Sequence, residues 1–204
     1  MKKNSNPISR SELRRQEFEQ RIVNAAIELF GEHGVEETSV VSIIEKAGIA
    51  YKTFFNHFPN KENLIFHIAN IYSSYSDLIF EESLKMPLCG ADRIEHSLVT
   101  IASEITSLDP SEATVFRRIL VRANLGPEQS KEEQNVKLYH AIWNILIDAR
   151  DKGELQEALS PDIYTEMIVG LFIAGIFSWA NQEGYPLVQR MQRTAAFIRH
   201  SMFK

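Results

Sequence analysis

Apolar residues along most of this chain recur every three or four positions, which is the spacing of one face of an α-helix. Val40, Ile43, Ile44 and Ala47 form one such stripe, at positions i, i+3, i+4 and i+7. No stretch alternates apolar and polar residues for long enough to predict a sheet strand. The prolines after Pro7 all fall between periodic segments: Pro59, Pro87, Pro110, Pro127, Pro161 and Pro186. The pattern predicts an all-α chain of about nine helices.

Capping residues give approximate bounds for these helices. Ser9 and Glu12 form a capping-box sequence, so a first helix is expected from there to His33. Further helices are expected over residues 40–47, 50–57, 60–85, 92–108, 110–124, 127–152, 161–183 and from 186 to near the C-terminus. Several begin with a cap followed by proline at the first helical position: Asp109-Pro110, Gly126-Pro127 and Ser160-Pro161.

The segment from 40 to 57 predicts two short helices joined by a tight turn. Ser39 is placed to cap the first helix, and Gly48 follows it where a left-handed residue commonly ends a helix. Pro59 ends the second helix, because the residue before a proline is pushed out of the helical region. This is the helix-turn-helix layout, in which the second helix reads base edges in the major groove through its N-terminal residues.

The first third of the chain resembles the N-terminal signature of the TetR family of bacterial transcriptional regulators. The matching positions are Arg21, Ile22, Ala25, Ala26, Leu29, Phe30, Gly34, Thr38, Ile43, Ala47, Gly48, Ile49, Thr53, Phe55, His57, Phe58, Lys61, Glu62 and Leu64. The resemblance implies a homodimeric repressor, with a DNA-binding domain over residues 1–60 and an effector-binding and dimerisation domain over 61–204. Phe55 stands where the family usually has tyrosine and Ala50 where it has serine, so no relative's operator sequence can be transferred to this chain.

The recognition helix supplies the predicted contacts with an operator in double-stranded DNA. We expect Tyr51, Lys52 and Thr53 to face base edges, because hydroxyl and ammonium groups pair with base donors and acceptors. Phosphate contacts are expected from Thr38, Ser39, Ser42, Asn56, His57 and Lys61. Core packing is the expectation for Phe54, Phe55 and Phe58, although the tyrosine that matches Phe55 in the family faces DNA.

The net charge of −5 argues at first against a DNA-binding protein. Residues 1–66 carry nine basic and nine acidic side chains, so the acidic excess lies entirely in the rest of the chain. The positive footprint must therefore be local, and we expect it from the basic N-terminal arm together with Lys46, Lys52 and Lys61.

Two sets of apolar residues are candidates for dimerisation and for a ligand pocket. The expected dimer surface is formed by Met167, Leu171, Gly175, Trp179, Val188, Met191, Ala195 and Ile198; without the family resemblance, core packing would be equally good. The candidate pocket residues, for which core packing is again the alternative, are Tyr72, Tyr75, Phe116, Leu120, Tyr139, Trp143 and Phe172. Arg117, Arg118 and Arg122 either pair with an anionic head group or meet surface carboxylates.

No enzymatic motif accompanies this pattern. The chain has no Glu-x-x-His pair, no His-Glu-x-x-His sequence, no Gly-x-Ser-x-Gly elbow and no phosphate-binding glycine loop, so we predict no catalysis, metal or cofactor. Cys89 is the single cysteine, and no leader or membrane segment is predicted, which indicates a cytoplasmic protein. Two functions stay open: a repressor released by a small, largely apolar ligand, or a regulator controlled by its abundance or by a protein partner.

Overall fold

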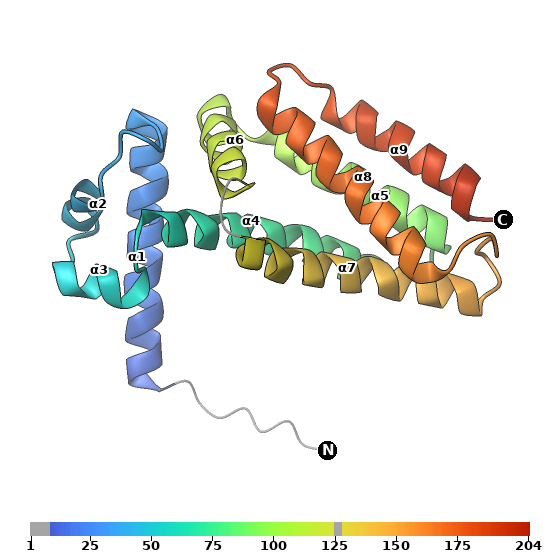
Figure 1. Cartoon of the computed structure of the whole chain (residues 1–204), viewed down its shortest axis with the longest axis horizontal. Helices are drawn as coiled ribbons and strands as arrows, with labels where there is room; N and C mark the ends of the chain where they lie inside the picture. The colour runs from blue at the N-terminus through green and yellow to red at the C-terminus, as the bar shows by residue number, and fades with distance from the viewer. Residues whose placement is uncertain (1–8, 125–127) are drawn as a thin grey trace. The chain divides into compact units, whose positions relative to one another are not determined.

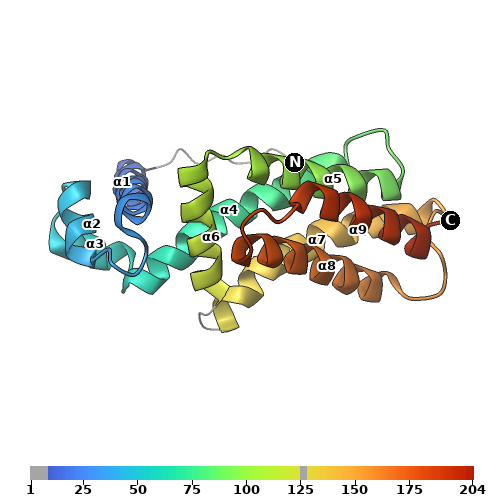
Figure 2. The ribbon, with the colours of Figure 1, turned by 90° about the horizontal axis from the view of Figure 1, so that it is seen from above.

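The computed structural model describes residues 9–124 and 128–204, with side chains for 9–123 and 136–204. Within these residues the regular elements are all α-helices, and Leu155 and Phe203 form an isolated antiparallel bridge. The helices, shown in Figures 1 and 2, are α1 Arg10–His33, α2 Val40–Ala47, α3 Tyr51–His57, α4 Lys61–Ser83, α5 Gly90–Ser107, α6 Pro110–Asn124, α7 Glu128–Asp151, α8 Pro161–Asn181 and α9 Leu187–Met202. The all-α prediction is confirmed.

The predicted helix ends differ from these bounds by a few residues. Ala50 is the N-cap of α3 and not its first residue, and Pro186 similarly precedes α9. The fifth helix begins at Gly90, two positions earlier than expected, with Cys89 as its N-cap. The proposed start of the seventh helix at Pro127, with its Gly126 cap, lies outside the described residues, as do the arm residues Lys2 and Lys3.

The chain divides into two compact units, one ending at Ile65 and the other beginning at Phe66. The domain boundary predicted after residue 60 coincides with the start of α4, whereas the two units divide inside this helix. The first unit therefore contains α1, α2, α3 and the first turn of α4. Its core is formed by fully buried side chains from each of these helices: Ile22, Ala26, Phe30, Ile43, Phe54 and Leu64.

The second unit is a helical bundle with one continuous apolar core. Helices α5 and α9 pack together, α8 packs on α6, α7 and α9, and Figures 1 and 2 show α8 and α9 side by side. A Cβ atom at Gly90 would lie 2.6 Å from Ala149 Cβ and 2.8 Å from Phe203 Cε1, so this glycine permits close contact between α5, α7 and the C-terminal residues. Such tight packing fixes the ends of the bundle.

Helix α8 is apolar on several of its faces. Among the described helices it alone is long and apolar enough to span a membrane by length and composition, a test that core helices also pass. Its buried side chains, including Ile168, Phe172 and Trp179, belong to the bundle core, while Ile163 and Met167 are exposed. The helix therefore has more apolar surface than the core of one chain covers.

Candidate nucleic-acid interface and ligand cavity

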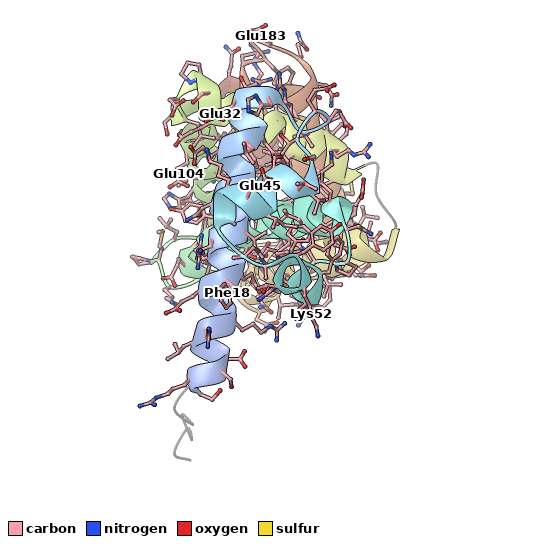
Figure 3. All side chains as sticks on the ribbon, turned by 90° about the vertical axis from the view of Figure 1, so that its left-hand side faces the viewer. Phe18, Glu32, Glu45, Lys52, Glu104 and Glu183 are labelled. Carbon is pink, nitrogen blue, oxygen red and sulfur yellow. The ribbon has the colours of Figure 1, made fainter. Side chains whose placement is uncertain are left out.

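The short helix α3 is anchored by one face and exposed on the other. The rings of Phe54 and Phe58 are buried in the first unit, as predicted. Tyr51 is 60% exposed and Phe55 is 39% exposed, and their ring centroids lie 4.9 Å apart on the outer face. The expectation that Phe55 packs in the core is therefore wrong. Lys52, labelled in Figure 3, projects from α3 into solvent and makes no ion pair within the described residues.

The turn between α2 and α3 is held by an arginine from α1. Gly48 takes the left-handed conformation, with φ of 59°, as its position predicted. Arg21 Nη2 donates hydrogen bonds to the carbonyl oxygens of Ala47 at 2.6 Å and Gly48 at 2.9 Å. Ala47 is the last residue of α2 and Gly48 is its C-cap, so neither carbonyl has a partner within that helix. Arg21 thus fixes the start of the recognition helix, a role that its place in the sequence did not reveal.

Two of the expected phosphate contacts instead stabilise the loop before α2. Thr38 is 2% exposed, and its hydroxyl donates to the carbonyl oxygens of Gly34 at 2.7 Å and Leu29 at 3.2 Å. Lys61 Nζ donates to the carbonyl oxygens of Val35, Glu36 and Thr38 at 3.0, 3.2 and 3.1 Å. An ammonium group has three donors, and all three are used here. The predicted phosphate roles of the Thr38 and Lys61 side chains are therefore corrected to structural ones.

The other polar candidates differ in how they face solvent. Ser39 caps α2, its hydroxyl accepting from the backbone N–H of Ser42 at 3.0 Å, and both residues lie at the positive end of that helix. Asn56 is exposed on α3. The side chain of His57 is 7% exposed, with Nδ1 3.8 Å from Glu19 Oε2, so this ring faces the domain interior and not a phosphate.

The positive charge near α3 is smaller than the sequence suggested. Lys46 forms an ion pair with Glu28, and Glu32 Oε1 lies 3.6 Å from the same ammonium. The hydrogen bond with Glu28 is the main cause that raises the pKa of Lys46. Lys46 and Lys61 are therefore both engaged within the protein, which corrects the expectation that they attract DNA. Of the three lysines predicted to form the footprint, Lys52 keeps its ammonium available.

A cavity of about 170 Å³ lies in the second unit, among side chains of α4 to α8. It is lined by Ala69, Tyr72, Ser73, Ser76, Asp77, Ile105, Phe116, Leu120, Ala123, Leu138, Phe172, Ile173, Ile176 and Phe177. Four of the predicted pocket residues are among these, namely Tyr72, Phe116, Leu120 and Phe172. The other three do not line it: Tyr75 is largely exposed, and Tyr139 and Trp143 stack on each other, with centroids 6.2 Å apart.

The cavity wall includes a carboxyl group that sequence reasoning missed. Asp77 on α4 is 6% exposed, and its burial raises its pKa to about 6. The charge of Lys137 acts in the opposite direction and that of Glu81 in the same direction. Burial also raises the pKa of the neighbouring Tyr72 phenol. Ionising a carboxyl group on an apolar wall costs free energy, and such groups are often found at binding sites, so Asp77 is a candidate ligand-binding residue.

The three arginines of α6 were expected to pair either with an anionic head group or with surface carboxylates, and the structure does not place them together in either role. Arg117 stacks on the Trp179 ring at 3.9 Å and donates hydrogen bonds to the carbonyl oxygens of Trp179 and Gln182, the latter at 2.9 Å. It therefore satisfies carbonyls at the C-terminal end of α8, where a positive charge is favourable. This corrects both roles considered for Arg117, while Arg118 is exposed and Arg122 is half-buried.

Known proteins agree with this architecture. Residues 22–68 match the family model of bacterial regulatory proteins, tetR family. The chain belongs to the TetR family. The fatty acid metabolism regulator protein of Bacillus subtilis (strain 168) is 26% identical over 172 residues, covering 82% of this chain and 87% of that protein. The match spans both units of this chain.

Solved TetR-family structures share the fold. SmeT, the repressor of a Stenotrophomonas maltophilia multidrug efflux pump, has a TM-score of 0.72 and 18% identity, covering 91% of this chain and 90% of SmeT. FadR of Bacillus subtilis, solved in complex with stearoyl-CoA, has a TM-score of 0.70 and 23% identity, covering 88% of this chain and 96% of FadR. This TetR-family chain is thus a transcriptional regulator related to ligand-responsive repressors.

Most of the residues that we expected at the dimer surface of this TetR-family chain lie in the core of the single chain. Gly175, Trp179, Met191, Ala195 and Ile198 are all buried where α8 packs on its neighbours. A Cβ atom at Gly175 would overlap Met191 Cε, which shows how closely α8 and α9 approach. The predicted surface role of these five residues is therefore wrong.

A different apolar set on the same two helices faces solvent. Met167 from the original prediction is exposed, and Leu171 and Val188 are partly so. Sequence reasoning missed Ile163 and Ile173 on α8 and Phe197 on α9, which are 41%, 36% and 53% exposed. Exposed apolar residues on packed helices are typical of a surface that another chain covers.

Proposed function

We propose that this chain is a repressor that binds a near-palindromic operator as a homodimer and is released by a small, largely apolar ligand. The observation that carries the proposal is the geometry of α3. Its inner face is fixed by Phe54 and Phe58, its start is held through Arg21, and its outer face presents Tyr51 and Lys52 to solvent. A short helix that is rigidly supported and exposed on one side is what entry into a major groove requires.

Base readout is assigned to Tyr51, Lys52 and Thr53 at the start of α3. Phosphate contacts are assigned to Ser39, Ser42, Asn56 and the backbone N–H groups that begin α2, because the N-terminus of a helix attracts anions. Phe55 adds an apolar surface beside Tyr51, suited to a thymine methyl group. The chain binds DNA through shape and a few local contacts, given its small positive footprint.

Dimerisation is assigned to the outer faces of α8 and α9. Ile163, Met167 and Phe197 expose apolar surface there, together with Gly170, at which a Cβ atom would meet nothing within 4 Å. The same face on two copies would form a symmetric four-helix contact about a two-fold axis. Such a dimer would present two copies of α3 to successive half-sites, with centres roughly 34–36 Å apart or a multiple of that distance.

Ligand control is favoured over control by abundance alone because the second unit contains a cavity. FadR of Bacillus subtilis binds stearoyl-CoA in its solved complex, and SmeT has been solved with triclosan, so proteins with this fold accept ligands that have a large apolar part. A cavity lined mainly by apolar and aromatic side chains is suited to the same kind of molecule. Because the chain acts on DNA, we place it in the bacterial cytoplasm.

The test is operator binding by the full chain and by two lysine variants. Operators are first selected from a random duplex library, and affinities are then measured for the selected duplex and for a scrambled one. Lys52→Ala should weaken specific binding by about 1–3 kcal/mol, roughly 5- to 150-fold, while the scrambled duplex loses only a single charge contact. Lys85→Ala removes an exposed lysine of the second unit and should leave both affinities unchanged.

Two outcomes would count against the proposal. Failure of the library to yield any enriched sequence would remove the specific DNA-binding function. Equal losses on selected and scrambled DNA for Lys52→Ala would mean that α3 positions the protein without reading bases.

A further inference from the structure

The cavity among α4 to α8 has an unusual distribution of charge. Of its described lining residues, Asp77 is the only carboxylic acid, and none is lysine, arginine or histidine. Asp77 is 6% exposed, and among the described side chains it has no hydrogen bond or ion pair; the charge of Lys137 acts on it from outside the cavity wall. A buried carboxylate without a partner is unfavourable, because it loses its hydration and gains no compensating bond. A cationic ligand would supply the pairing that no described side chain provides.

The rest of the wall is suited to a positively charged organic group. The rings of Tyr72, Phe116, Phe172 and Phe177 all line the cavity, and the Tyr72 and Phe116 centroids lie 4.4 Å apart. Aromatic faces attract cations through the negative potential above the ring. Ser73 and Ser76, which precede Asp77 on α4, also line the cavity and add hydroxyl groups to its wall. Carboxylate, aromatic rings and hydroxyls together are the groups that bind an ammonium ion.

An anionic head group finds no comparable partner in the described part of this wall. Arg117 is adjacent to Phe116 in the chain, but its guanidinium is occupied by Trp179 and Gln182. Lys137 is near enough to influence Asp77, yet it is exposed and does not line the cavity. A carboxylate or phosphate placed beside Asp77 would be repelled by it, since like charges in a site of low polarity cannot both remain ionised.

The volume of the cavity limits the size of the apolar part of a ligand. A dry cavity of about 150 Å³ holds one benzene molecule. The cavity in this chain, at about 170 Å³, is slightly larger. It therefore accommodates one aromatic ring or a short branched alkyl group with a small polar end.

We propose that this cavity binds a small organic amine, with its ammonium group on the Asp77 carboxylate and its apolar part among the aromatic rings. The further claim that this amine is the molecule that releases the operator rests on the proposed repressor function. The binding claim itself does not.

Three probes of similar shape test the charge preference. Calorimetry on the full chain compares 2-phenylethylammonium, the neutral 2-phenylethanol and the anionic 3-phenylpropanoate. The ammonium should bind at least tenfold more tightly than the alcohol, and the carboxylate should not bind measurably. Comparable binding of all three, tighter binding of the anion, or no binding by any of them at millimolar concentration would overturn the proposal, and this comparison needs no variant.

Two variants then test whether the preference for the ammonium probe depends on Asp77. In Asp77→Asn the advantage of the ammonium over the alcohol should fall to about threefold or less, because the amide keeps the shape and removes the charge. Glu104→Gln removes a carboxylate that is exposed on α5, outside the cavity, and should keep the full preference. An unchanged preference in Asp77→Asn would move the binding site elsewhere and refute the assignment.

Operator binding by the same proteins separates the two proposals. If the ammonium binds with the Asp77-dependent preference and weakens operator binding, both the site and its role as effector site are supported. If it binds in that way but leaves operator affinity unchanged, the site stands and the effector role fails. If no operator can be selected, the proposed function fails while the calorimetry still decides the chemistry of the cavity.

Discussion

Replacing Asp77 with asparagine should make the protein more stable at neutral and alkaline pH. In the folded chain burial raises the pKa of this carboxyl to about 6, from 3.8 for an unperturbed aspartate. The folded state therefore holds the proton more tightly than the unfolded state does. From about pH 4 the stability of the wild type falls as pH rises through the folded-state pKa, and the loss levels off about one pH unit above it.

The size of the effect follows from the difference in pKa. Two units at 1.36 kcal/mol each give at most about 3 kcal/mol over the whole range, of which about 1 kcal/mol falls between pH 5 and pH 8. Asparagine resembles the protonated acid and has no such dependence. The stability difference between Asp77→Asn and the wild type should therefore be smallest near pH 4 and largest near pH 8.

Urea unfolding at pH 5, 6, 7 and 8 measures this difference for the wild type, Asp77→Asn and Glu104→Gln. The comparison uses transition midpoints at matched m-values, because extrapolated free energies carry errors of roughly 10–15%. Glu104 is an exposed carboxyl, and its variant should follow the wild type. If the profiles of the wild type and Asp77→Asn run parallel from pH 5 to pH 8, the carboxyl is not held in an unfavourable environment and the reasoning is wrong.

Two other predictions concern the interfaces. Arg21→Met should lower the free energy of unfolding by about 1–2 kcal/mol and weaken operator binding, because it removes the hydrogen bonds to the α2–α3 turn. The control Arg14→Met loses only a similar stacking on Phe18. Equal losses for the two variants in urea unfolding would contradict the role of Arg21 in holding this turn. If α8 and α9 form the proposed dimer, Phe197→Glu should shift the protein to monomer in sedimentation analysis and reduce operator affinity at least tenfold. Leu78→Glu, equally exposed on α4, should leave the association state unchanged.

The sequence predicted local features well because their causes lie within a few residues. Ser39 and Gly48 bound α2 as expected, since a cap and a left-handed glycine act on the adjacent turn. Proline positions separated the helices for the same reason. The whole recognition helix could thus be located to within one residue, and Phe54 and Phe58 were correctly assigned to its buried face.

Partners far apart in the chain were not predictable in this way. Lys61 and Arg21 reach backbone carbonyls more than twenty positions away, and a basic side chain looks the same in sequence whether it meets a carbonyl or a phosphate. The inner face of α8 could not be chosen because apolar residues occur on several of its sides. Asp77 gave no signal at all, since an isolated aspartate on a helix is ordinarily solvated.

The two faces of α3 also separate the residues proposed to recognise DNA from those that keep the domain folded. Substitutions at exposed positions away from caps and packed contacts usually change stability by less than about 0.5 kcal/mol. The solvent side of this helix, at Tyr51, Lys52 and Asn56, is therefore open to variation that redirects the protein to new promoters without endangering its fold. A library randomised at these three positions should consist mostly of well-folded proteins, each available for selection against a chosen target duplex.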